Sequence, residues 1–508
     1  MAGREAAGAA ELSSALLAEA LADLRADFDE ALFLVRSADA KLAATAAELE
    51  ESRDCLHART LETLNAQIWA ARSRSGAAGS RLLALRQRAS PNGEPTLAML
   101  AELAAEKASF ADLLRAEQAL VAALASAADW QSPSFLHSTL PAAGRQCGRI
   151  TPHWNDYKRD RHLDADAYEA AYVREMVDGP RDLRALLTAC GMAAFTTIVA
   201  FVRDEGWLDR PVVIGMGLYH ESREILERAL GERVHAVDER EAEVFLRAID
   251  ELNPSAVFLD SLSNTKWMPV PDLAAVVERL RRRDTYLIVD NTGLSVSLQP
   301  FALAGSSTRL IVFESLLKYP QLGLDRANAG VIVARGNDAE VLADYREHLG
   351  TNVADVAVHA LPRPERWVLE RRLVRLHRNT TLLAERLRDQ AGSLAQVVYP
   401  GLTGHSSHRV AQGLAFRGGC FSLLLRRGDQ HLRRERLFVE TAVAEAARRG
   451  VPLHAGSSFG FNTTRVYLTA ARAEYGEPFL RVAAGTEHRL EVEVLGEVFA
   501  AAVREATR

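Results

Sequence analysis

The chain has 508 residues, of which 48% are hydrophobic and 25% charged, a balance typical of soluble globular proteins rather than disordered or membrane chains. This length allows about three units of ordinary domain size. The formal net charge of −6 argues against a nucleic-acid partner, because proteins of that class concentrate positive charge on one surface.

Cysteine usage and the N-terminus bear on the compartment. The cysteines lack the short paired spacing of a zinc site or a disulfide framework, and they are Cys55, Cys147, Cys190 and Cys420. The N-terminus lacks a signal-peptide pattern, and the apolar run at 193–202 is far shorter than the roughly 20 residues that cross a bilayer. These features predict a cytoplasmic protein without a membrane partner.

Residues 1–127 are rich in Ala, Leu, Glu and Arg, which favour helix. Apolar residues recur at intervals of three and four, and these are Leu17, Leu21, Leu24, Phe28, Leu32 and Val35. The spacing predicts one long amphipathic helix with a break near 76–79, then a turn at 90–93 and a second helical stretch. The two form a helical extension, as a hairpin or short coiled coil. Its role as an oligomerisation arm, a flap or a partner-binding arm stays open.

Beyond about residue 129, short apolar runs alternate with helical patterns. The candidate strands are 211–214, 256–259, 286–289, 310–313 and 330–333. Such runs favour a parallel sheet covered on both faces, whose ligands bind at the carboxyl edge of the strands. We expect a linker and clamp segment at 128–180, a large cofactor-binding domain at 181–335 and a smaller C-terminal α/β domain at 336–508.

Lys318 and Asp290 are candidate catalytic and cofactor-binding residues because both follow predicted strands. Lys318 comes five residues after Phe313, and Asp290 ends the run 286–290, so both belong to the same edge of the sheet. A lysine can hold pyridoxal phosphate as a Schiff base, and a carboxylate can keep the ring nitrogen protonated, which makes the ring an electron sink. The ordinary alternatives are a solvated surface lysine and an aspartate that caps the next helix.

Two glycine-containing turns follow predicted elements. Gly191 and Met192 open a helical stretch, where backbone N–H groups and the helix dipole can approach a phosphate. The turn at 215–217 lacks the third glycine and the downstream acid of a dinucleotide fingerprint. We interpret it as a tight turn that places Tyr219, whose ring can stack on a flat cofactor.

From about 156 to 465, the chain resembles the Cys/Met-metabolism family of pyridoxal-phosphate enzymes, which includes cystathionine γ-synthase, cystathionine lyases and methionine γ-lyase. Short matches follow the family's order, at 157–159, 191–194, Tyr219, 260–264, 290–292, Ser315 with 318–319, 399–402 and 418–422. The resemblance implies the fold type I architecture: a mostly parallel sheet sandwiched by helices, with a smaller C-terminal α/β domain. The N-terminal helical region is an addition to it.

The resemblance also implies roles for single residues. Lys318 would carry the cofactor and act as the base, assisted by Tyr219. The cofactor-binding residues of this subunit would be Gly191, Met192, Tyr219, Asn264, Asp290, Thr292, Ser315 and Lys318. Within that set, Gly191, Met192 and Ser315 would hold the phosphate, and Asn264 would contact the 3-hydroxyl.

Four further residues would complete the site. Tyr157 and Arg159 resemble a clamp that reaches the cofactor phosphate from a neighbouring subunit, which implies a homodimer or homotetramer. Ser458 and Arg465 would bind the amino-acid substrate, with Arg465 pairing with its carboxylate through a bidentate fork. A surface salt bridge is the alternative for Arg465.

Some positions depart from the family. Leu317 stands where the family usually has a threonine, 320–325 breaks its glycine-histidine-serine pattern, and the stretch 458–465 is shorter than usual. His405 and His408 are interpreted as structural or substrate-proximal, and no metal is expected, because two imidazoles without a third ligand are poor indicators of zinc.

These features predict a pyridoxal-phosphate-dependent lyase or transferase. It would act through an external aldimine on an amino acid with a leaving group on the γ- or β-carbon, by elimination or replacement. An aminotransferase on the same fold is one alternative, because the short stretch before Arg465 resembles that class. A non-catalytic protein with a helical partner-binding arm is the other, although retention of Lys318, Asp290 and Tyr219 argues against it.

Overall fold

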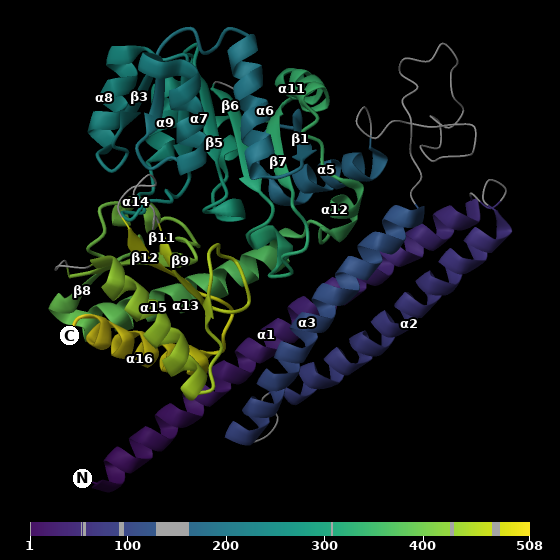
Figure 1. Cartoon of the computed structure of the whole chain (residues 1–508), viewed down its shortest axis with the longest axis vertical. Helices are drawn as coiled ribbons and strands as arrows, with labels where there is room; N and C mark the ends of the chain where they lie inside the picture. Colours follow the sequence, from purple (N-terminus) through teal and green to yellow (C-terminus); the bar gives the residue numbers. More distant parts are fainter. Residues whose placement is uncertain are drawn as a thin grey trace.

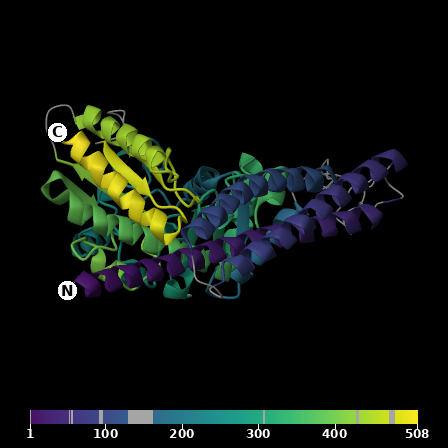
Figure 2. The same ribbon diagram turned by 90° about the horizontal axis from the view of Figure 1, so that it is seen from below.

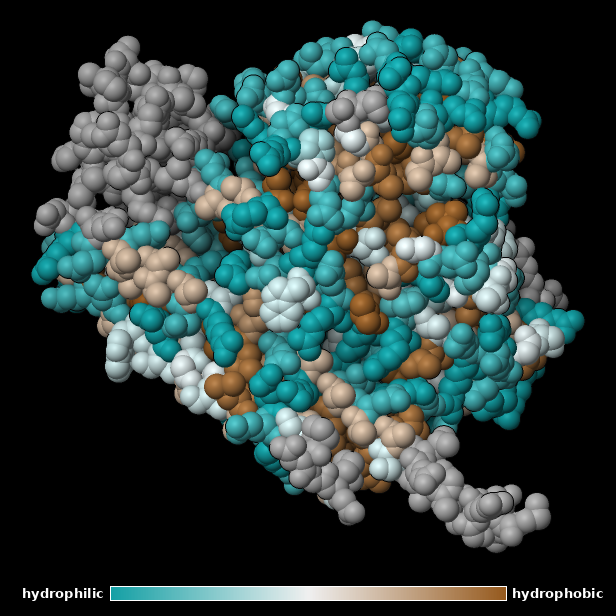
Figure 3. Space-filling view, turned by 180° about the vertical axis from the view of Figure 1, so that it is seen from behind, coloured by the Kyte–Doolittle hydropathy of each residue, from teal (hydrophilic) through white to brown (hydrophobic). Residues whose placement is uncertain are grey.

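The computed structural model describes residues 2–51, 53, 57–90, 96–128, 162–305, 308–426, 431–469 and 478–508. They form an N-terminal helical bundle, a seven-stranded sheet covered by helices, and a smaller five-stranded sheet with its own helices (Figure 1). Viewed from behind, the surface is mostly hydrophilic, with hydrophobic residues exposed in patches across its middle (Figure 3). None of the described helices is long and apolar enough to span a membrane.

The N-terminal bundle consists of α1 (Ala2–Glu51), α2 (Ala58–Arg88) and α3 (Leu97–Ala128). Figure 2 shows it as an elongated group of helices that reaches beyond the rest of the molecule. Its core is apolar and includes Leu24, Phe28, Leu82, Leu103 and Phe110. The helical character is confirmed, but two helices stand where the spacing predicted one before residue 90.

The predicted break near residues 76–79 is wrong, because α2 continues through Gly76 and Gly79. A glycine inside a helix costs about 1 kcal/mol relative to alanine. Burial of Ala71, Leu82 and Leu85 on either side of the glycines offsets this, so packing against the neighbouring helices overrides the local preference.

The large sheet has the strand order β1-β7-β6-β5-β4-β2-β3. Its strands are β1 (Leu183–Thr188), β2 (Val212–Gly215), β3 (Val234–Val237), β4 (Ala256–Asp260), β5 (Tyr286–Asp290), β6 (Arg309–Ser315) and β7 (Gly330–Arg335). All five predicted strands are confirmed. The strands β3, β2, β4, β5 and β6 are parallel, whereas β7 is antiparallel to both β6 and β1. The sheet is therefore mostly parallel, as predicted.

Helices cover both faces of this sheet. One apolar cluster includes side chains of α6 (Gly191–Asp204), α7 (His220–Leu230) and α11 (Gly336–Leu349). A second cluster includes α5 (Leu163–Met176), α8 (Ala242–Leu252), α9 (Leu273–Leu280), α10 (Pro300–Ala304) and α12 (Asp355–Ala360). Because α11 packs on α6 and β1, we propose that the large domain extends past residue 335 to the connection after α12.

The small domain follows the long helix α13 (Arg366–Ala391). Its sheet has the order β10-β11-β12-β9-β8, with β8 (Ala395–Val398), β9 (Cys420–Leu425), β10 (His454–Ala455), β11 (Arg465–Thr469) and β12 (Phe479–Ala483). The helices of this domain are α14 (His408–Ala411), α15 (His431–Arg448) and α16 (Arg489–Ala506). Phe421, Phe438 and Phe499 lie in its core.

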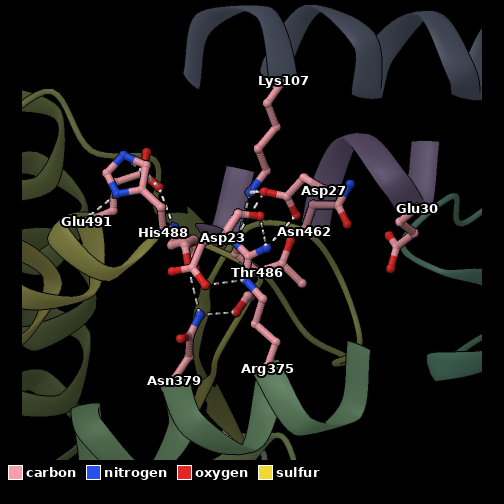
Figure 4. Close-up of polar contacts among 12 residues, drawn as sticks. Asp23, Asp27, Glu30, Lys107, Arg375, Asn379, Asn462, Thr486, His488 and Glu491 are labelled. Atoms are coloured by element: carbon pink, nitrogen blue, oxygen red, sulfur yellow. Dashed lines mark hydrogen bonds and ion pairs between the residues drawn. The ribbon is translucent and has the colours of Figure 1, made fainter. Parts of the chain in front are cut away.

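The bundle docks on the small domain through buried ion pairs (Figure 4). Asp27 of α1 accepts two hydrogen bonds from Arg375 of α13, at 2.9 and 3.1 Å, and pairs with Lys107 of α3 at 2.9 Å. Asp23 accepts two hydrogen bonds of 2.8 Å from Arg378 and a third from the backbone N–H of Arg489. These contacts join α1 and α3 to α13 and to the start of α16.

Candidate active site

The candidate active site lies where β4, β5 and β6 end. Asp260 of β4 is in register with Asp290 of β5. The backbone N–H of Ser261 donates to the carbonyl oxygen of Asp290 over 2.8 Å, and the alignment continues from β5 to β6. The carboxyl edge of the sheet thus brings both aspartates and the loop after β6 to one place, where ligands of open α/β sheets bind.

Lys318 lies at this edge, in the loop after β6. Burial lowers the pKa of Lys318, and the carboxylates of Asp325 and Asp290 act in the opposite direction. Its Nζ donates to Oγ of Ser458 over 2.5 Å and lies 5.3 Å from the centre of the Phe459 ring. The structure therefore brings together Lys318, Asp290 and Ser458, which the sequence had placed in one site.

A buried glutamine orders the loop that carries Lys318. Nε2 of Gln321 donates to the carbonyl oxygens of Leu316 and Ala327, at 3.0 and 2.6 Å. Its Oε1 accepts the backbone N–H groups of Arg326 and Ala327, at 2.8 and 2.9 Å. The hydrogen-bonding capacity of this amide is filled, so the loop is fixed without the glycine-histidine-serine pattern of the family.

Asp290 and Asp260 share the strand ends but differ in their partners. Burial raises the pKa of Asp290, whereas hydrogen bonds from Thr292 and the charge of Lys318 lower it. The backbone N–H of Thr292 donates to Oδ1 of Asp290, and the Thr292 hydroxyl accepts the N–H of Ser315, both over 2.9 Å. Burial and the neighbouring Asp290 raise the pKa of Asp260 well above its usual range. We therefore assign the negative charge to Asp290 and a proton to Asp260.

The start of α6 forms a cradle against the end of β6. A Cβ added at Gly191 would lie 2.8 Å from Cβ of Ser315, and one added at Gly330 would collide with the carbonyl group of Cys190. Only glycine permits these approaches. The first N–H groups of a helix have no partner within it, so Gly191, Met192 and Ser315 together provide donors suited to a phosphate.

Tyr219 lies at the beginning of α7, close to Asp290. Burial raises the pKa of Tyr219, and the negative charges of Glu221 and Asp290 act in the same direction. The turn before it is held by Glu239, whose Oε1 accepts the N–H of Gly217 over 3.0 Å. The structure thus has the tight turn that the sequence predicted at 215–217.

Arg465 begins β11 and is half-buried. Its guanidinium stacks on the ring of Phe461, with 3.3 Å between Cζ and the ring centre, and donates to the carbonyl oxygen of Ser457 over 2.8 Å. Burial lowers the pKa of Arg465, and the charge of Arg115 acts in the same direction. No carboxylate among the described residues forms an ion pair with it, so the alternative of a surface salt bridge has no partner there.

Arg481 of β12 is a site residue that the sequence analysis missed. It is 2% exposed, and its Nη2 donates to the backbone carbonyl oxygen of Asn264 over 2.9 Å, while Nη1 donates to the Asn264 side chain. Its Nε has no hydrogen-bond partner and no carboxylate pairs with it in the described parts of the chain. A buried guanidinium without an anion is costly, so Arg481 is a candidate to receive a substrate carboxylate. The only sequence signal was an arginine inside the apolar run 479–484.

Of the remaining predicted cofactor-binding residues, the structure describes Asn264 but not the two clamp residues. Asn264 lies at the domain interface, where the bond from Arg481 to its Oδ1 leaves the amide NH₂ to act as a donor. Tyr157 and Arg159 lie outside the described residues, so the clamp stays a prediction.

His405 and His408 make local contacts to the backbone. Nε2 of His405 is 2.8 Å from the carbonyl oxygen of Trp267, and Nδ1 of His408 is 3.3 Å from that of Pro400. Within the described ranges, no group of three or more His, Cys, Asp or Glu side chains is arranged to hold a metal ion.

The residues at the sheet edge fit pyridoxal phosphate. Lys318 is an amine of lowered pKa, Asp290 is a half-buried carboxylate at the neighbouring strand end, and the cradle at Gly191 suits a phosphate. This fold and this site define a pyridoxal-phosphate-dependent enzyme of fold type I. The chain belongs to the Cys/Met metabolism PLP-dependent enzyme family, whose model matches residues 119–488.

Individual relatives are distant. The bifunctional enzyme flvA of Aspergillus flavus is 26% identical over 310 residues, which cover 59% of this chain and 37% of that protein. Methionine gamma-lyase of Arabidopsis thaliana is 25% identical over 289 residues, which cover 54% and 62%. The match thus spans less than two thirds of either relative.

Solved structures share the fold. Cystathionine gamma synthase from Xanthomonas oryzae pv. oryzae aligns with a TM-score of 0.58 and 22% identity over 74% of this chain and 93% of its own. Cystathionine gamma-lyase from Lactobacillus plantarum aligns with a TM-score of 0.58 and 19% identity over 73% and 93%.

Proposed function

We propose that this protein is a lyase or transferase that acts on an amino acid with a leaving group on the γ- or β-carbon. The observation that carries the proposal is the meeting of Lys318 and Asp290 at one sheet edge, each shifting the pKa of the other. Membership of the Cys/Met metabolism family supports it.

The bound cofactor supplies an electron sink for negative charge that develops on the substrate α-carbon. Asp290 maintains that capacity, because its carboxylate keeps the ring nitrogen protonated. The N–H of Thr292 and the nearby Lys318 stabilise the charged form of Asp290. Asp260, which we assign as protonated, adds no second negative charge beside it.

Lys318 is the proposed base. Burial lowers the pKa of Lys318, so a larger fraction of its amine is neutral and able to accept the α-proton near neutral pH. The hydroxyl of Ser458 holds Nζ in place over 2.5 Å. Lys318 can then return the proton further along the substrate, with Tyr219 assisting proton transfer or departure of the leaving group.

Arg481 and Arg465 are the proposed substrate-binding arginines. Arg481 and Tyr467 are cross-strand partners in β12 and β11, and Arg465 lies two residues before Tyr467, so all three face the same side of the small sheet. We propose that Arg481 pairs with the α-carboxylate, since it is the more deeply buried and lacks an anionic partner among the described residues. Arg465 then contacts a more distant part of the substrate.

The visible spectrum of the purified protein tests cofactor attachment. We expect an absorption band from the lysine-linked cofactor that is lost in Lys318→Ala and retained in the matched control Lys266→Ala, whose Nζ lies over the Trp267 ring. A colourless protein that ignores added cofactor would refute the proposal. Product analysis then separates the reactions: elimination releases ammonia and a keto acid without an acceptor, whereas transamination requires a keto-acid acceptor.

We also propose a homodimer or homotetramer whose site is completed by Tyr157 and Arg159 of a neighbouring subunit. The support is the resemblance of 157–159 to the family's clamp. Mixing inactive Lys318→Ala with inactive Arg159→Ala should restore part of the activity, because each hybrid dimer contains one intact site. A monomer in light scattering, or no recovery in a hybrid that demonstrably forms, would contradict this.

A cytoplasmic location is proposed as well. The described cysteines Cys190 and Cys420 are free thiols, which suits a reducing compartment. Cell fractionation with an antibody to the native protein tests this.

A further inference from the structure

The helix α3 places an arginine at the loop that carries Lys318. Nη2 of Arg115 donates to the carbonyl oxygen of Gly323 over 3.3 Å, and its buried Nε has no partner among the described residues. One turn later, Gln118 donates to the carbonyl oxygen of Ala360 over 3.1 Å. Arg115 precedes the residues matched by the family model, 119–488, so it is an addition of this chain to the site.

The surroundings of Arg115 carry excess positive charge. A Cβ added at Gly323, whose carbonyl oxygen accepts from Arg115, would collide with Oδ1 of Asn462. Asn462 follows Phe461, on whose ring Arg465 stacks, so Arg115 and Arg465 reach the same loop. Burial and the charge of Arg115 lower the pKa of Arg465, whereas Asp325 acts in the opposite direction. Asp325 also acts on Lys318, as does Asp290. Because we assign Asp290 to the cofactor ring nitrogen, Asp325 is the one remaining carboxylate that acts on Lys318 and Arg465. Neither Arg115 nor Arg465 forms an ion pair with a carboxylate of the described residues. Like charges held together in this way favour an anionic ligand between them.

The bundle holds Arg115 in a fixed position. The buried pairs of Asp23 and Asp27 with α13 anchor α1, and Lys107 of α3 joins the same network (Figure 4). On α3 itself, Phe110 lies in the bundle core, and Leu114, which directly precedes Arg115, packs against this core. A guanidinium on such a support loses little freedom when it binds a ligand.

We propose that Arg115 and Arg465 together bind a second anionic group, a carboxylate or a phosphate, on the side chain of the amino-acid substrate. This rests on the proposed function, in which Arg481 takes the α-carboxylate and the cradle at Gly191 takes the cofactor phosphate. Guanidinium groups match both carboxylate and phosphate through paired N–H donors. The N-terminal bundle is thereby a specificity element of the active site.

Calorimetry on the cofactor-loaded protein tests binding without turnover. Succinate and inorganic phosphate serve as probes for a carboxylate and a phosphate. The probe that binds more tightly identifies the class of anion. We expect Arg115→Gln to weaken that probe at least about tenfold. Arg88→Gln, which removes an exposed pair with Glu102 inside the bundle, should change it less than about twofold. Absence of binding by both probes to the wild-type protein, or equal effects of the two variants, would overturn the proposal.

Steady-state kinetics supply the second readout. Two homologous amino acids are compared, one with a leaving group that ends in a carboxylate or phosphate and one with a neutral leaving group. Arg115→Gln should raise KM about tenfold or more for the anionic substrate and less than twofold for the neutral one, with partial recovery in Arg115→Lys. A purely structural role would affect both substrates alike. If the wild type converts neither, the proposed function fails, while calorimetry still decides the anion site.

Discussion

The ammonium group of Lys318 lies 2.5 Å from the hydroxyl of Ser458, so the small domain provides a polar contact to the proposed base in the large domain. Ser458 has a φ of 74°, in the left-handed region that few residues other than glycine adopt. We expect Ser458→Ala to retain the cofactor band but to lower kcat about tenfold, because the hydrogen bond that holds the Lys318 amine in place is lost. Ser457→Ala is the matched control, since only its backbone carbonyl is used. Equal kcat values for the two variants would contradict this role.

Asp290 and Asp260 should respond differently to removal of a carboxylate. Asp290→Asn should bind the cofactor yet lose about 100-fold or more in kcat, because an amide cannot keep the ring nitrogen protonated. Asp260→Asn should lose less than about tenfold, because an amide resembles the protonated carboxyl that we assign there. Single-turnover rates measure both. A larger loss in Asp260→Asn would reverse the assignment of the charge.

Substitution of Arg481 and substitution of Arg465 should raise KM for different sets of substrates. Arg481→Lys should raise KM about 10- to 100-fold for every amino-acid substrate, because a buried bidentate contact to the α-carboxylate is lost. Arg465→Lys should act mainly on substrates with a second anionic group. Cofactor affinity is measured in parallel, since Arg481 also orients Asn264. The reverse pattern would mean that Arg465, and not Arg481, binds the α-carboxylate.

The docked bundle should contribute to stability. Asp23→Ala removes three hydrogen-bonded contacts to Arg378 and Arg489 and the ion pair of 3.7 Å with the buried Arg375. The free energy of unfolding should therefore fall by about 3 kcal/mol. Asp39→Ala removes an exposed pair with Arg72 and should change it by less than about 1 kcal/mol. Denaturant titration compares the two. Similar losses would show that the docking pairs are not stabilising.

Glu314 should make stability depend on pH. Burial raises the pKa of Glu314 to about 7, although the hydroxyls of Ser295 and Tyr172 donate to it and act in the opposite direction. The pKa of Glu314 in the folded protein exceeds the unfolded value of about 4.3. The stability that protonated Glu314 contributes is therefore fully present below the unfolded pKa and is lost as pH rises through about 7.

Between pH 4.5 and 8, the free energy of unfolding should therefore fall less for Glu314→Gln than for the wild type. The difference should be on the order of 2–3 kcal/mol. Thermal unfolding across that pH range measures the difference. Glu340→Gln, which removes an exposed partner of Arg184, should follow the wild-type curve. Parallel curves for Glu314→Gln and the wild type would exclude the effect.

Local patterns in the sequence were enough to find the inner strands, because buried parallel strands are continuous apolar runs. In the large sheet, the two edge strands were missed. β3 (Val234–Val237) is short and has no fully buried residue, and β1 (Leu183–Thr188) contains an exposed Arg184. β3 therefore carries little of the hydrophobic signal on which the prediction depends. In β1 the other residues are buried, but Arg184 interrupts the apolar run.

Lys318, Asp290 and the glycine-rich start at Gly191 could be found from the sequence because each directly follows or opens an element, so its place at the sheet edge follows from local order. Arg481 and Arg115 could not. Arg481 meets Asn264 from 217 positions away, and Arg115 meets Gly323 from 208 positions away. Contacts between such distant segments exist only after the bundle and the two sheets have packed together. The residues at the strand ends were therefore identified from the sequence alone. Arg481 and Arg115, which we propose as ligands of the substrate, were identified only from the tertiary structure, because packing of distant segments brings them to the site.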